Sequence, residues 1–133
     1  MQDATIAAAG RLLLAMLFLL SGLPKLAAPA ATIGYIASAG LPFPFLGYVV
    51  ALGAELGCGL LLLAGFHARI AAAIMAAFTI AAALVFHSNF PEQNEMVHFL
   101  KNIALTGGLL QVVAFGAGAF SFDARRLRIA SAG

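Results

Sequence analysis

Four apolar stretches constrain this chain more than any other feature. They cover residues 6–26, 45–66, 70–90 and 97–120, and each is close to the ~20 residues that a helix needs to cross the hydrocarbon core of a bilayer. Only 9% of the residues are charged, whereas roughly a quarter are charged in soluble domains. The stretches also lack the two-residue alternation of barrel strands. We therefore expect an all-α fold, a polytopic membrane four-helix bundle that forms a single domain over residues 1–133.

The connection between the first two spans is apolar but rich in helix breakers. Pro29, Pro42 and Pro44 prevent one continuous helix there. Residues 30–39 are free of proline, so they can form a short interfacial segment with Tyr35 at the depth of the lipid headgroups.

The charges outside the spans predict the orientation. Arg69 and the arginine-rich tail after the last span fall on one side of a four-span protein, whereas Glu92 and Glu95 fall on the other. Lys and Arg are retained on the cytoplasmic side of bacterial membranes. We therefore expect a multi-pass protein of the bacterial inner membrane with both termini cytoplasmic.

The first apolar stretch has an alternative interpretation as a cleavable signal peptide. Arg11, the apolar run after it and Ala28-Pro29-Ala30 resemble the parts of such a peptide. The orientation of the other spans would be the same in either case.

Several functional classes are disfavoured by composition. The formal net charge of +2 comes from scattered cations and not from a basic stripe, so nucleic acid is not an expected partner. Cys58 is the only cysteine, which excludes an internal disulfide and a Cys-x-x-Cys redox pair. No metal-ligand constellation is present, although His87 and His98 could in principle ligate haem. Two histidines in a helical membrane protein are more often hydrogen-bonding groups, so we expect no metal.

Ionisable residues inside the spans are the candidates for function, because each costs ~2.5 to 3.5 kcal/mol on insertion scales. The first span carries Arg11 and Lys25, and the second carries Glu55 near its centre. Arg11, Phe18 and Lys25 are seven residues apart and share one helical stripe, so the first span presents a cationic face. One interpretation is a structural ion pair of Arg11 and Glu55, with Lys101 as an alternative cation and Lys25 extending toward lipid phosphates.

The second interpretation is a binding site in the outer half of the bundle. If all three cations faced inward, Arg11, Lys25 and Lys101 would outnumber the one anion, Glu55. The hydrogen-bond donors at the same depth are His87, His98 and Asn102. Such a pocket suits a small anion, or the carbonyl oxygens and reduced anionic forms of a quinone. The candidate ligand-binding residues are Lys25, Glu55, His87, His98, Lys101 and Asn102.

Five motifs together resemble a known family. They are Arg11-Leu-Leu-Leu, Phe18-Leu-Leu-Ser-Gly-Leu-Pro-Lys25, Glu55-Leu-Gly-Cys-Gly, His98-Phe-Leu-Lys101-Asn102 followed by Gly107-Gly108, and Ser121-Phe-Asp123. Over nearly the whole chain, this pattern resembles the DoxX family of small four-helix membrane proteins. The resemblance implies a role linked to quinones or sulfur compounds, with quinone as the possible cofactor.

Three functional hypotheses follow. The first is a membrane subunit associated with quinone-linked or sulfur-compound oxidoreduction that works with a protein partner subunit or as a homo-oligomer in the lipid bilayer. The second is a non-catalytic membrane scaffold or assembly partner, and a small transporter is a more distant third. The sequence leaves open whether the chain is itself an enzyme.

Overall fold

The structure, a computed structural model, describes residues 2–133. Its helices are α1 (Gln2–Ala27), α2 (Pro29–Ser38), α3 (Pro44–Leu52), the π-helical segment η1 (Gly53–Gly57), α4 (Cys58–Ala64), α5 (Ala68–Phe86), α6 (Gln93–Phe115) and α7 (Phe122–Ala132). Within this described range, four helices are long and apolar enough to cross a membrane: α1, the continuous run α3–η1–α4, α5 and α6. The expected all-α membrane fold is confirmed.

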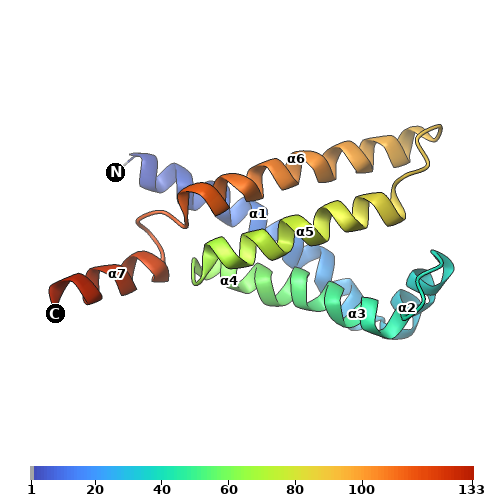
Figure 1. Cartoon of the computed structure of the whole chain (residues 1–133), viewed down its shortest axis with the longest axis horizontal. Helices are drawn as coiled ribbons and strands as arrows, with labels where there is room; N and C mark the ends of the chain where they lie inside the picture. The colour runs from blue at the N-terminus through green and yellow to red at the C-terminus, as the bar shows by residue number, and fades with distance from the viewer. Residues whose placement is uncertain (1) are drawn as a thin grey trace.

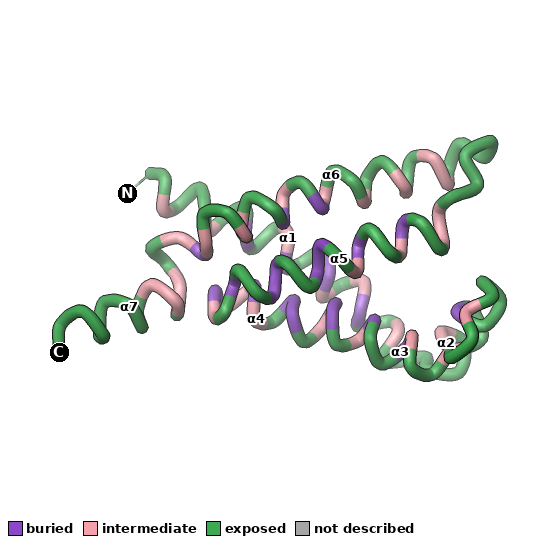
Figure 2. The backbone as a smooth tube through the Cα atoms, in the orientation of Figure 1, coloured by how far each residue is buried: buried purple, intermediate pink, exposed green. Residues whose placement is uncertain are grey.

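The spans enclose a core in which alanines pack around a few larger side chains such as Leu62, Met75 and Leu109. Figure 1 shows α5 and α6 running side by side, with α1 crossing behind them and α4 next to α5. The buried residues gather where these helices meet (Figure 2), and on α5 most of them are alanines spaced as one helical stripe. Because alanine has a short side chain, the helix backbones can approach closely, as is typical of packing between membrane helices.

The two ends of the bundle differ in what they carry. Both chain termini lie at one end, called the terminus side, whereas α2 and the connection from α5 to α6 lie at the other, called the α2 side (Figure 1). The central parts of the four long helices, which run between these two sides, coincide with the four predicted spans.

Several span boundaries differ from the sequence prediction, most clearly in the third and fourth spans. The third span was expected to reach residue 90, but α5 ends at Phe86. The fourth was expected to cover 97–120, but α6 already begins at Gln93 and ends at Phe115. It ends there because Gly116 and Gly118 take positive φ angles of 80° and 86°, which an α-helix cannot contain.

Helix α2 confirms the expected short helix between the first two spans. It begins with Pro29, which is suited to the first helical turn because its backbone has no N–H to satisfy. Ile36 is buried against α3, where a side chain at Gly47 would lie 3.2 Å from it. Tyr35 stacks on Phe86 of α5, with ring centroids 5.3 Å apart. Helix α2 therefore covers the α2 side of the bundle between α3 and α5.

Two elements were not predicted. One is η1, where the second span widens for five residues around Glu55. The other is α7, which leaves the bundle at the terminus side and has no buried residues among those described (Figures 1 and 2).

Candidate functional site

A cavity of about 460 Å³ opens between the helices on the α2 side of the bundle. Its walls come from α1, α2, α3, η1, α5 and α6. The structure places all of the candidate ligand-binding residues on these walls, namely Lys25, Glu55, His87, His98, Lys101 and Asn102. The predicted convergence of these side chains is therefore observed, while the ligand itself stays a prediction.

The centre of the cavity wall is an ion pair between Lys25 of α1 and Glu55 of η1. Lys25 Nζ lies 2.8 Å from Glu55 Oε1 and 2.7 Å from Oε2, and it also donates to the Ser21 carbonyl oxygen at 3.2 Å. The Tyr48 hydroxyl donates to the Lys25 carbonyl oxygen at 3.1 Å. Glu55 is 6% exposed, so its charge is almost enclosed by protein and depends on Lys25 for compensation.

Close approach of α1 to η1 makes this ion pair possible. A methyl group at Gly22 would lie 2.8 Å from the Leu56 side chain and 3.0 Å from Glu55 Cβ, so only a glycine fits there without a shift. Lys25 follows three residues later on the same helical face. The wider turn of η1 faces Gly22 of α1. π-Helical turns of this kind are frequent at functional sites.

The expected pair between Arg11 and Glu55 is wrong. Arg11 is buried at the terminus side, where its guanidinium donates to the Ala117 carbonyl oxygen and, at 2.9 Å, to that of Phe120. The prediction placed Arg11 on the correct, inward face of its helix but did not foresee that the loop after α6 would supply carbonyl partners. Lys25, which was expected to reach toward lipid, is the actual partner.

This correction changes the electrostatics of the cavity. Arg11 lies at the other end of the bundle and Lys25 is neutralised by Glu55. Of the three cations expected at the cavity, only Lys101 is therefore left uncompensated. Within the described residues Lys101 has no ion-pair partner, and Asn102 lies next to it on α6. The cavity thus offers one ammonium group and one amide to a ligand.

Histidines mark the outer edge of the cavity. The rings of His87 and His98 are stacked with centroids 5.0 Å apart, so they join the end of α5 to the start of α6. His87 Nδ1 also lies 3.2 Å from Glu95 Oε2. Glu95 is not among the residues that the sequence predicts for this site. The short connection between His87 at the end of α5 and Glu95 in the first turn of α6 is the signal that could have indicated the contact.

The rest of the cavity wall is mainly apolar, apart from the hydroxyl side chains of Ser21, Thr32, Tyr35 and Thr79. It is formed by aliphatic and aromatic side chains including Leu17, Phe18, Val50, Phe78, Val85, Phe86 and Leu105. Within residues 2–133 the structure contains no cluster of three or more His, Cys, Asp or Glu side chains that could hold a metal ion. A mainly apolar molecule with a few hydrogen-bonding atoms is the kind of ligand that such walls accommodate.

The fold and cavity define a class: a small helical membrane protein with a polar site enclosed by apolar spans. The chain belongs to the DoxX family, whose model matches residues 6–88. It is similar to the inner membrane protein YqjF of Escherichia coli strain K12, with 39% identity over 113 residues that cover 85% of each chain. It is also similar to the inner membrane protein YphA of the same organism, with 29% identity over 120 residues that cover 86% of each chain. No solved structure matches the chain.

Proposed function

We propose that the cavity on the α2 side binds a quinone, and that the chain serves as a membrane subunit associated with quinone-linked oxidoreduction. The observation that supports this most is the convergence of the Lys25–Glu55 pair, Lys101 and Asn102 on one cavity with apolar walls. Lys101 and Asn102 would donate hydrogen bonds to a quinone carbonyl, and the ammonium group would stabilise negative charge that develops on reduction.

Size and charge favour a quinone over a small anion. A volume of about 460 Å³ lies in the range of ~300–1,000 Å³ that is typical of small-molecule sites, and it leaves a compact oxyanion with little contact to the walls. Compensation of Lys25 by Glu55 also removes part of the positive charge that an anion would need. A small sulfur oxyanion therefore remains the second choice of ligand.

The cellular setting is also part of this proposal. Both relatives are inner membrane proteins by name, and we place this chain in the same membrane with the terminus side facing the cytoplasm, as Arg69 and the arginines of α7 indicate. Reduction of a quinone takes two electrons and two protons. We propose that a reduced redox centre of a protein partner supplies the electrons, and that water at the open end of the cavity supplies the protons.

The test is a binding titration of the purified protein in detergent. Wild type and Lys101→Met are titrated with a short-chain benzoquinone and, separately, with thiosulfate. Lys101→Met keeps the length of the side chain and removes its charge, so we expect quinone affinity to fall by roughly tenfold, the scale of one charged hydrogen bond. Arg125→Gln is the control, because it removes a cation that does not line the cavity.

Equal quinone affinity in wild type and Lys101→Met, or no quinone binding at all, would contradict the proposal. Loss of thiosulfate binding alone in Lys101→Met would assign the site to an anion instead.

One observation favours the alternative of a membrane scaffold. Helix α6 is the least enclosed span, with 11% of its apolar window buried compared with 39% for the second span. Exposed residues such as Val97, Leu100 and Ile103 could contact a second protein as well as lipid. If wild type binds neither quinone nor thiosulfate, this function becomes the better account.

A further inference from the structure

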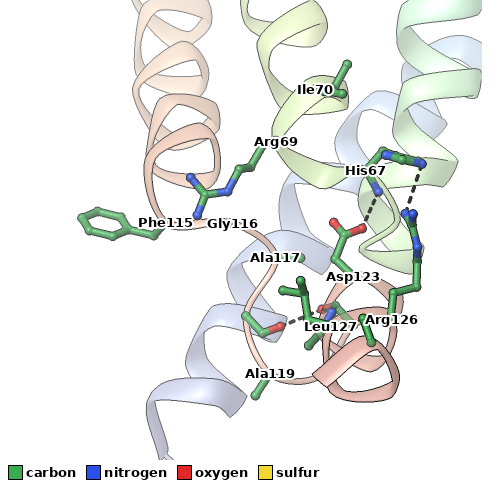
Figure 3. Close-up of a pocket in the computed structure, with 14 residues that line it drawn as sticks. His67, Arg69, Ile70, Phe115, Gly116, Ala117, Ala119, Asp123, Arg126 and Leu127 are labelled. Carbon is green, nitrogen blue, oxygen red and sulfur yellow. Dashed lines mark hydrogen bonds between the residues drawn. The ribbon is translucent and has the colours of Figure 1, made fainter. Parts of the chain in front are cut away.

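A second cavity lies at the terminus side, at the far end of the bundle from the proposed quinone site. It has a volume of about 760 Å³ and is formed where α5 begins, α6 ends and α7 departs. Its ionisable lining residues are Arg69, Arg126, His67 and Asp123. Figure 3 shows Arg69 on one side of this cavity and Arg126 on the other.

The single acidic group of this lining is already committed to the backbone. Asp123 Oδ1 accepts the His67 N–H at 2.8 Å, and Oδ2 accepts the Ala68 N–H at 2.9 Å. Asp123 thus compensates the positive end of α5, where free N–H groups gather, and leaves the two arginines with a surplus of positive charge.

Both arginines are held in place by contacts that leave donors available. Arg69 donates to the Val113 and Ala114 carbonyl oxygens at 3.0 and 2.8 Å, and both bonds use the same terminal nitrogen. The other two guanidinium nitrogens lie beside Gly116, where a side chain would approach them to 3.2 and 3.4 Å. Arg126 lies over the Phe66 ring and has one terminal nitrogen 3.2 Å from His67 Nε2.

The remaining walls of the cavity are apolar and open to the surroundings. Phe115 at the end of α6 is 77% exposed, and Ile70 at the start of α5 is 62% exposed. These two residues belong to membrane-spanning helices, whereas Arg126 belongs to α7 beyond the last span. The cavity therefore crosses the boundary between hydrocarbon and headgroup layers.

We infer that this cavity binds an anionic phospholipid, with the headgroup at the arginines Arg69 and Arg126 and the acyl chains along Ile70 and Phe115. Guanidinium groups bind phosphate oxygens through pairs of parallel hydrogen bonds, which makes arginine well suited to this role. The division of the cavity into a cationic part and an apolar part matches the division within a lipid molecule, whereas free phosphate would use only the first part.

The test measures the affinity of the full-length chain in detergent, at constant ionic strength and below its thermal midpoint. The probes are a phosphatidylglycerol, a phosphatidylcholine with the same acyl chains, and inorganic phosphate. Arg126→Gln removes a cavity cation, and Arg125→Gln is the matched control because Arg125 is on the same helix but does not line the cavity. We expect wild type to prefer phosphatidylglycerol. Arg126→Gln should weaken this binding by roughly tenfold, whereas Arg125→Gln should weaken it by less than about twofold.

Three outcomes would overturn the inference. Equal loss in both variants would show general attraction to a basic helix, and equal affinity for both lipids would show that the phosphate charge is not recognised. Inorganic phosphate that binds as tightly as phosphatidylglycerol would assign the cavity to a soluble anion.

Discussion

The most informative single residue is Glu55, because its carboxylate is enclosed by protein and compensated by one lysine. Removing one partner of such a pair leaves the other charge uncompensated, whereas removing both can be nearly neutral. The pair also lies on the wall of the proposed quinone site. Its effect on the stability of the protein and its contribution to ligand binding must therefore be measured separately.

We predict that Glu55→Gln lowers the thermal midpoint in detergent, by the equivalent of about 1–3 kcal/mol. This is less than the ~3–5 kcal/mol of a fully buried pair, because the Lys25 side chain is still 32% exposed. The double variant Glu55→Gln with Lys25→Met should recover part of the loss. Ile74→Ala, a change at an exposed position of α5, is the control. A midpoint for Glu55→Gln equal to that of the control would refute the role of the ion pair in stability.

Gly65 gives the sharpest steric prediction. Its φ of 69° is in the left-handed region, where a non-glycine residue costs about 1–3 kcal/mol. A methyl group there would also lie 2.5 Å from Ser121 Cβ and 2.9 Å from a guanidinium nitrogen of Arg11. Gly65→Ala should therefore lower the thermal midpoint strongly. Gly107→Ala should not, because nothing lies within 4 Å of the added group. Similar midpoints in the two variants would contradict the packing described at the terminus side.

Which residues face inward could be predicted from the sequence, but which residues they contact could not. The seven-residue spacing of Arg11, Phe18 and Lys25 predicted an inward stripe, and α1 buries Arg11, Ala15, Phe18 and Gly22. The partner of Arg11 was missed because it consists of backbone carbonyls in a loop more than 100 residues away. Such oxygens are present in every residue and leave no signature in the sequence.

At the scale of elements, α7 is attached to the bundle mainly through its first turn. Ser121 caps this helix, since its hydroxyl oxygen accepts the Ala124 N–H at 3.1 Å. Asp123 caps α5 instead of its own helix, and its backbone N–H donates to the Gly65 carbonyl oxygen at 2.9 Å. The motif Ser121-Phe-Asp123, used above only for resemblance, thus joins the last helix to the turn between the second and third spans.

We predict that Asp123→Ala destabilises the protein by about 0.5–2 kcal/mol, the usual effect of losing a helix cap. The matched control is Glu92→Ala, since Glu92 precedes α6 without a side-chain cap hydrogen bond. Hydrogen exchange should locate the effect at the His67 and Ala68 amides, whose acceptor is removed. Unchanged exchange at these two amides would refute the capping role.

The positions of the spans could be predicted because lipid requires ~20 apolar residues per crossing. The π-helical turn and the short last helix could not be predicted in this way. The π-helical turn at η1 depends on how α1 packs against it, and α7 is only 11 residues long and has no apolar stripe to predict it.

At the scale of the whole molecule, the placement of the terminus side in the cytoplasm remains a prediction. In a Cys58→Ala background, single cysteines at Asn94 and Ser131 lie on the α2 side and the terminus side respectively. An impermeant thiol reagent applied to cells with a permeabilised outer membrane should label the cysteine at position 94 and not the one at position 131. The reverse pattern would invert the orientation.

Photoaffinity labelling can show whether a quinone occupies the cavity on the α2 side. A short-chain azidobenzoquinone is bound to the purified protein, activated by light, and the labelled residues are mapped by mass spectrometry. We expect labels on the cavity walls, in residues 78–87 and 98–105, that are suppressed by excess unlabelled quinone. Labels spread over lipid-facing positions such as Leu13 and Leu110, or labels that unlabelled quinone does not suppress, would contradict quinone binding in this cavity.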